Sequence, residues 1–377
     1  MSKQDHPAAA AAAGGMEMPR WLDALGGFID RTAGFWQKLG DLESSANRAE
    51  LDAIPIDRPI YVAGLARSGS TILLELLAGR PGVATHRYRD FPPIFTPLFW
   101  NRAFAQVYRA DAPPAERAHK DRILVTPDSP EAMEEVLWMR FFAGIHDTGR
   151  GQVLDATTSN PAFERFYTDH LKKILLIRQG RRYLSKGNYN LTRFAYLRKL
   201  FPGARFVVPV REPRWHVASL MKQHRLFCAE EKRDPRILKH MQRVGHLEFG
   251  LDRRAINTGD TAAAQGIERL WREGEEVRGW ARYWAMLYGF VLDQKERDPA
   301  ALGEAVHLVR YEDLCDRPEE TLTVAFAHAE LPLEPGELAP MAARLSQPTY
   351  YDPGFTPEEE AVIAEETKTV RARLGYA

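Results

Sequence analysis

Short apolar runs alternate with amphipathic stretches along most of this chain. Four runs have the length and composition of buried strands, at residues 60–63, 182–185, 205–210 and 305–311, although Pro209 weakens the third prediction. Other stretches carry apolar residues at the three- and four-residue spacing of helices: 71–77, 131–143, 163–177, 193–200, 217–224, 277–296, 319–329 and 358–373. This alternation predicts an α/β fold with a central, mostly parallel sheet flanked by helices.

The N-terminal segment has its own pattern. Residues 19–42 carry large apolar side chains at helical spacing, among them Trp21, Phe28 and Phe35. A helix that packs on the protein body or on a partner subunit is the simpler interpretation. A helix on a membrane surface is the alternative, although its polar face lacks a dense basic stripe. We expect three parts: a tail with this helix at residues 1–55, a domain at residues 56–377, and within it a helical or irregular insertion at about residues 225–275.

Composition narrows the class of protein. Basic and acidic residues both number 51, so the formal net charge is zero and no global positive field exists to hold a nucleic acid. Two cysteines cannot form a disulfide framework, which indicates a reducing compartment and a cytoplasmic location. No apolar run is long enough for a membrane span.

A glycine-rich turn follows the first predicted strand. Residues 64–71 read Gly-Leu-Ala-Arg-Ser-Gly-Ser-Thr, and a helix is expected directly afterwards. The backbone N–H groups of such a turn and the N-terminus of the helix together form an anion site. Ser70 stands where nucleotide hydrolases need a lysine, so ordinary nucleotide hydrolysis is disfavoured. Arg67 is the cation within the turn that can supply the charge instead.

A second basic segment follows the third predicted strand. Arg211 comes directly after residues 205–210, Pro213 suits a helix start, and Ser219 lies in the early turns of that helix. Arg211 and Ser219 can therefore turn toward one anion, with the guanidinium and the hydroxyl both donating hydrogen bonds. Together with the first turn, this segment predicts a second phosphate pocket at the carboxyl edge of the sheet.

The two segments together resemble those of sulfotransferases that use 3′-phosphoadenosine-5′-phosphosulfate (PAPS), especially the bacterial family that is similar to tyrosylprotein sulfotransferases. The resemblance extends over roughly residues 58–375 and includes segments 184–188, 201–206 and 309–318. It implies a P-loop-like, three-layer fold. It also implies that the 5′-phosphosulfate is held by Arg67, Ser68, Gly69, Ser70 and Thr71, and the 3′-phosphate by Arg211 and Ser219. The basic, glycine-rich C-terminal loop of the vertebrate cytosolic members has no counterpart here.

Sulfuryl transfer is a displacement at sulfur, and negative charge develops on the bridging oxygen as the leaving phosphate departs. Cations held at that oxygen contribute most to the rate. Arg67 and Lys186 are the candidates for this role, with Ser70 and Thr71 donating hydrogen bonds. No metal is needed in principle, because these groups replace it, and no spacing typical of metal ligands stands out.

An alcohol acceptor also needs a base within one hydrogen bond. His86 and Asp90 are the nearest proton acceptors after the turn, and a purely local role for both is an equal alternative. His246 and Glu248 form a second candidate pair in the insertion, where they point the same way if that segment is a strand. A structural role is the more common one for such a pair.

The acceptor itself is not named by the sequence. Residues 91–104, expected to be a structured loop, hold an aromatic cluster that either lines an acceptor pocket for a small or lipid-like molecule or belongs to the core. Two rival functions stay open. A small-molecule P-loop kinase needs a lysine at position 70 and a magnesium carboxylate, for which Asp155 is the modest candidate. A non-catalytic nucleotide-binding protein would keep the pocket and lack a base. Homo-oligomerisation is also open.

Overall fold

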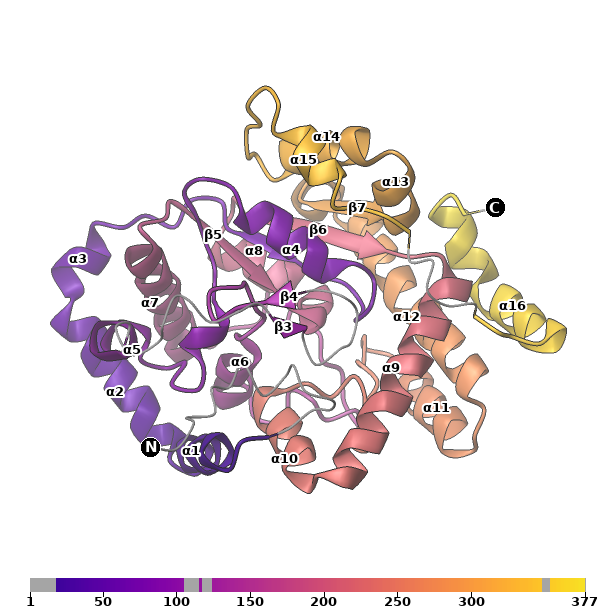
Figure 1. The fold of residues 1–377 in the computed structure, drawn as a ribbon, viewed down its shortest axis with the longest axis horizontal. Coiled ribbons are helices and arrows are strands. Elements are labelled where there is room, and N and C mark those ends of the chain that lie inside the picture. Colours follow the sequence, from indigo (N-terminus) through magenta and orange to yellow (C-terminus); the bar gives the residue numbers. More distant parts are fainter. Residues whose placement is uncertain (1–17, 105–114, 117–123, 348–352, 377) are drawn as a thin grey trace.

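The computed structural model describes residues 18–104, 115–116, 124–347 and 353–376. Five strands form a parallel sheet at its centre in the order β2-β5-β1-β6-β7 (Figure 1). They are β1 (Ile60–Val62), β2 (Val83–Ala84), β5 (Arg182–Lys186), β6 (Arg205–Val210) and β7 (Val306–Arg310). The predicted α/β class and the four predicted strands are confirmed, and β2 is an additional short edge strand.

The strands bury side chains on both faces of the sheet. In β1, Ile60 and Val62 lie in one apolar cluster with α4 (Ser70–Ala78) and α14 (Pro318–His328). Tyr61 points the other way, into a larger cluster built by α7 (Pro161–Arg178), α8 (Phe194–Leu200) and α12 (Glu276–Arg297). Because helices cover both faces, β1 and all of β6 after Arg205 are apolar. The result is a three-layer, P-loop-like arrangement.

The remaining elements surround this centre. They are α1 (Arg20–Arg31), α2 (Ala33–Ala46), α3 (Arg48–Asp52), α5 (Pro97–Phe104), α6 (Glu135–Phe141), α9 (Pro213–Arg233), α10 (Pro235–Val244), α11 (Thr261–Arg272), α13 (Tyr311–Asp316), α15 (Leu338–Ala342), α16 (Pro357–Arg373) and an antiparallel pair, β3 (Ala115–Glu116) and β4 (Leu124–Val125). Within the described ranges, no helix has the length and hydropathy needed to cross a bilayer.

Several predicted elements have different bounds in the structure. The helix predicted over residues 19–42 is two helices, α1 and α2, separated by a turn at Thr32. Residues 91–104, predicted as a loop, contain α5, and the helix predicted from residue 131 begins at Glu135. The insertion around residues 225–275 is largely helical, because it holds the second half of α9, α10 and α11.

Pro209 lies inside β6 without breaking it. The carbonyl of Val207 accepts a hydrogen bond from the N–H of Ala63 at 3.0 Å, on the side of β6 that faces β1. Two residues later, Pro209 faces the same side, where β1 has already ended and the chain turns at Gly64. The missing N–H therefore falls at the end of the β1–β6 pairing and not in its middle, where a proline would interrupt the ladder.

Candidate functional site

The glycine-rich turn lies at the carboxyl end of β1 and leads into α4. Arg67 and Gly69 both have positive φ angles, 70° and 100°. Gly69 is required for a second reason, because a Cβ atom at this position would lie 2.7 Å from the ring of Tyr311. Positive φ angles within a turn direct successive N–H groups toward one point, and the N-terminus of α4 adds partial positive charge there. The turn therefore has the shape of an anion site.

The two basic segments meet in the folded chain. Arg67 Nε donates a hydrogen bond to Ser219 Oγ at 3.4 Å, from the turn to the second turn of α9. The ring of His216 lies beneath them, with Nε2 2.9 Å from the carbonyl oxygen of Ala66. Burial, and then the charges of Arg211 and Arg67, lower the pKa of His216 to about 3. The neutral ring therefore donates Nε2–H to Ala66 and holds the backbone of the turn.

Arg211 lies at the end of β6 on the same edge of the sheet. Its guanidinium carbon is 5.1 Å from the centre of the Tyr311 ring, the ring that also contacts Gly69. Its carbonyl accepts a hydrogen bond from Trp284 Nε1 at 3.2 Å, and the residue is 6% exposed. Tyr311 thus connects the turn with Arg211, so the two predicted phosphate pockets are neighbours.

Lys186 brings a further cation to the turn. It ends β5, whose register places it beside Val62 at the end of β1. Its Nζ donates to Thr71 Oγ1 at 3.1 Å and lies 3.4 Å from Glu131 Oε1. The ammonium therefore lies between the hydroxyl at the start of α4 and a carboxylate.

Glu131 is the member of this cluster that sequence reasoning missed, because the residue was placed inside a helix. It lies instead in an extended segment before α6, where its N–H donates to the His86 carbonyl at 3.1 Å. Arg87 and Pro130 form a β-bridge beside it. These contacts join residues far apart in the chain, so no local sequence signal could have indicated them.

His246 and Glu248 approach the same cluster from the insertion. The segment is not the strand that was considered; it follows a left-handed Gly245 that ends α10. The two side chains nevertheless pair, with His246 Nδ1 3.6 Å from Glu248 Oε2. Asn188 Nδ2 donates to Glu248 Oε1 at 2.7 Å, just beyond Lys186.

The His246 imidazole and the Glu248 carboxylate shift each other's pKa in opposite directions. Burial alone would lower the pKa of His246, but the hydrogen bond and charge of Glu248 raise it above the usual value, and Glu131 and Lys186 also act on it. Burial alone would raise the pKa of Glu248, but His246 and Asn188 lower it. Each member of the pair thus favours the charged form of the other, and both oxygens of Glu248 have partners.

His86 and Asp90 lie apart from this cluster. Both are 1% exposed. His86 Nε2 is 3.0 Å from His170 Nε2, and Arg178 donates to both oxygens of Asp90 at 2.6 Å. Although burial opposes it, the His86 hydrogen bond and the Arg178 charge hold the pKa of Asp90 well below its usual range. Their side chains are enclosed, and the backbone carbonyl of His86 accepts the hydrogen bond from Glu131.

Two other sequence candidates also lie elsewhere. The aromatic cluster at residues 91–100 is divided: Phe95 is 1% exposed and packs on Phe166 in the core, whereas Phe91, Phe99 and Trp100 are half-buried. Asp155, the magnesium candidate of the kinase alternative, lies in an exposed loop, where it accepts hydrogen bonds from Thr157 and Thr158. It follows no strand of the sheet.

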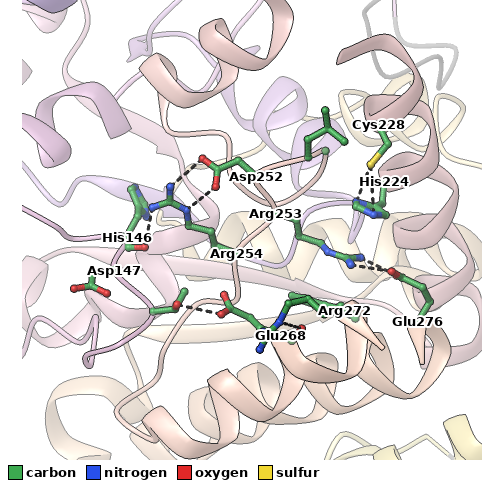
Figure 2. A pocket seen from close by; sticks show the side chains of 14 residues that line it. His146, Asp147, His224, Cys228, Asp252, Arg253, Arg254, Glu268, Arg272 and Glu276 are labelled. Atoms are coloured by element: carbon green, nitrogen blue, oxygen red, sulfur yellow. Dashed lines mark hydrogen bonds and ion pairs between the residues drawn. The ribbon is translucent and has the colours of Figure 1, made fainter. Parts of the chain in front are cut away.

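Figure 2 shows a polar cavity of about 550 Å³ in the region of residues 225–275, apart from the turn. It is lined by the chain just beyond Glu248, from Gly250 to Arg254, and by α9 and α11. Its charges are largely paired within the protein: Arg253 binds Glu276 at 2.7 Å, and Arg254 binds Asp252 at 2.9 Å. A cavity with such balanced charge offers no excess positive potential for a phosphate, in contrast to the turn.

Comparison with known proteins finds one matching family model and several similar solved structures. Residues 59–247 match the model of the Sulfotransferase family. No curated protein matches. Solved structures with a similar fold include sulfotransferase STF1 from Mycobacterium tuberculosis H37Rv (16% identity, 88% of this chain and 81% of that chain, TM-score 0.45). STF9 from Mycobacterium avium has the same identity and coverage with a TM-score of 0.47. The sulfotransferase domain from the curacin biosynthetic pathway has 16% identity over 85% of this chain and 99% of that chain, with a TM-score of 0.40.

Proposed function

This chain belongs to the sulfotransferase family, and from that premise we propose that it moves a sulfuryl group from PAPS to a hydroxyl or amine acceptor. The observation that carries the proposal is the contact between the two basic segments, Arg67 Nε to Ser219 Oγ at 3.4 Å. A donor with phosphate groups at both the 5′ and 3′ positions needs two adjacent anion pockets, and this contact supports such a pair.

The donor would bind with its 5′-phosphosulfate in the turn. The N–H groups of residues 67–71 and the guanidinium of Arg67 would hold the charged oxygens. Arg211 and Ser219 would hold the 3′-phosphate. Arg211 follows β6, the strand next to β1, and Ser219 lies in the second turn of the helix that comes after it. This division of roles follows the family resemblance and is supported by the geometry.

The transfer itself would be an in-line displacement. The acceptor oxygen or nitrogen forms a bond to sulfur while the bond from sulfur to the bridging oxygen breaks, and adenosine 3′,5′-bisphosphate leaves with the electron pair. Lys186, held at Thr71, and Arg67 would stabilise the charge that develops on the bridging oxygen. These cations are fixed by the fold before the reaction begins, so little reorganisation is required.

We assign the acceptor proton to Glu131. It is the carboxylate that contacts Lys186, the cation held at Thr71 where the phosphosulfate would bind. His246, whose pKa Glu248 raises, would position the acceptor rather than take its proton. His86 and Asp90 are too enclosed for the role.

We also propose that residues 56–377 act as one sulfotransferase domain and that the protein works in the cytoplasm. Cys228 and Cys315 are both unpaired, in keeping with a reducing compartment.

Isothermal titration calorimetry tests which nucleotide the protein binds. We expect adenosine 3′,5′-bisphosphate to bind without added metal, and ATP with Mg²⁺ to bind much more weakly. Binding of ATP–Mg²⁺ but not of the bisphosphate would instead favour the kinase alternative. Transfer of labelled sulfate from PAPS to components of a cell extract then separates an enzyme from a non-catalytic nucleotide-binding protein, because only an enzyme labels an acceptor.

A further inference from the structure

The outer sides of α1 and α2 carry an apolar stripe. Among the described residues, six large apolar side chains are exposed, and four of these lie on the two N-terminal helices: Trp21, Phe28, Phe35 and Leu42, which are 45–60% exposed. Successive members are seven residues apart, so the two on each helix share one face. Single exposed apolar side chains are common on protein surfaces, but four of them in line on adjacent helices indicate a binding surface.

The stripe cannot turn inward, because the opposite sides of both helices are already held. Asp23 Oδ1 of α1 binds Arg243 of α10 at 2.6 Å. In α2, Glu43 forms a buried ion pair with Lys173 of α7 at 3.0 Å, and Lys173 also donates to the Gly40 carbonyl at 2.7 Å. Removing either partner from that enclosed pair would be costly, so the orientation of α2 is fixed. The two helices run along the outer edge of the molecule (Figure 1).

Charges of both signs lie beside the stripe: Asp41, next to Leu42, is half-buried, and the basic excess is found among the exposed side chains. Arg31 follows Phe28 by three residues and Lys38 follows Phe35 by three, so each cation lies next to an aromatic ring on the outer side. The exposed charged residues of α1 and α2 are Arg20, Asp30, Arg31 and Lys38, three basic and one acidic. The whole chain is neutral, so this excess is local.

This combination fits an anionic lipid surface. Trp and Phe side chains enter the boundary between headgroups and acyl chains, and neighbouring Lys and Arg side chains extend to the phosphates. A second copy of the chain fits less well, because stacking the stripe on itself would bring its own Arg31 and Lys38 toward those of the partner. We propose that α1 and α2 dock this enzyme on the surface of a membrane containing anionic lipids.

An ion pair joins α1 to the helix that precedes His246, the residue that we propose positions the acceptor. Arg243, which binds Asp23, lies in the last turn of α10, and His246 follows three residues later. A docked molecule would therefore hold its insertion close to the lipid. The proposal is independent of the donor and of the residue that accepts the proton.

Sedimentation with lipid vesicles tests this surface, using the full chain and vesicles of phosphatidylcholine alone or with phosphatidylglycerol. We expect binding to the mixed vesicles that weakens as salt is raised. Replacing the stripe by W21Q, F28Q, F35Q and L42Q together should reduce binding at least about tenfold, because apolar insertion supplies much of the affinity. R31Q with K38Q should remove the preference for phosphatidylglycerol.

The matched control changes the two other exposed apolar residues, L251Q with V324Q, which lie outside α1 and α2. This variant should bind vesicles like the original chain, and circular dichroism should show that all variants are folded. The proposal is overturned if the original chain does not bind mixed vesicles, or if the stripe variant binds them equally well. It is also overturned if sedimentation velocity shows a dimer that the stripe variant dissociates while no vesicle binding occurs.

Discussion

Arg211 and Arg67 are both arginines at the same edge of the sheet, but they lie at different ends of the expected donor. Arg211→Ala should weaken binding of adenosine 3′,5′-bisphosphate by about 1.5–3 kcal/mol, the range for hydrogen bonds to charged groups. Arg67→Ala should lower turnover more than nucleotide affinity, because its charge is needed most as the bridging oxygen becomes negative. Calorimetry and steady-state kinetics at one salt concentration measure both. Unchanged bisphosphate affinity in Arg211→Ala would exclude the 3′-phosphate pocket.

Glu131 gives a second prediction at the scale of a residue. Glu131→Gln keeps the size of the side chain but cannot accept the proton, so turnover should fall by roughly 10²–10⁴-fold while bisphosphate affinity stays similar. Glu248→Gln is the matched control, and we expect it to act mainly on the KM for the acceptor, since Glu248 orients His246. The reverse pattern, with Glu131→Gln active and Glu248→Gln inactive, would move the base to the insertion.

At the scale of elements, the strands that hold the site could be predicted and their side chains' partners could not. β1 and β6 are almost wholly apolar because helices cover both faces, and β5 and β7 keep a shorter apolar run; both patterns are visible in the sequence. The turn at residues 64–71 and Arg211 were found because each directly follows such a strand. Glu131 was missed because its position depends on a bridge between residues 87 and 130, which is a contact of tertiary structure.

The helices show a similar limit. The spacing of Trp21, Phe28 and Phe35 predicts a helix, but it does not show which side faces water, because both sides of α1 and α2 carry large apolar residues. Nor does local periodicity predict the break at Thr32. The distance of His86 and Asp90 along the chain after the turn suggests a site role, yet both side chains are buried against α7, His86 on His170 and Asp90 on Arg178.

At the scale of the whole molecule, buried histidines predict sensitivity to acid. Burial lowers the pKa of His170 and His216, and it lowers the pKa of His240 and His328 to about 4. Unfolded histidines bind protons near pH 6.5, so below that pH the unfolded state binds more protons and the free energy of unfolding falls as the pH falls toward 4. His246 shifts the other way: its contribution is fully present below pH 6.5 and is lost as the pH rises through its raised pKa.

Urea denaturation at pH 7.5 and pH 5 measures this effect, and the midpoint should be clearly lower at pH 5. His328→Gln can still donate to the Phe206 carbonyl that His328 contacts at 3.1 Å, and the position lies outside the site cluster. This variant should show a smaller difference between the two midpoints. Equal midpoints for the original chain at both pH values would contradict the prediction.

The pairing of β6 with β1 has a consequence for how ligands are distinguished. One strand ends in the turn and the other ends in Arg211, and backbone hydrogen bonds fix the register between them, with Val62 opposite Val207. The main-chain register thus sets the distance between the two proposed anion pockets. We expect surface substitutions to leave this distance unchanged. In the proposed binding mode, we expect nucleotides whose phosphates are spaced differently to bind more weakly.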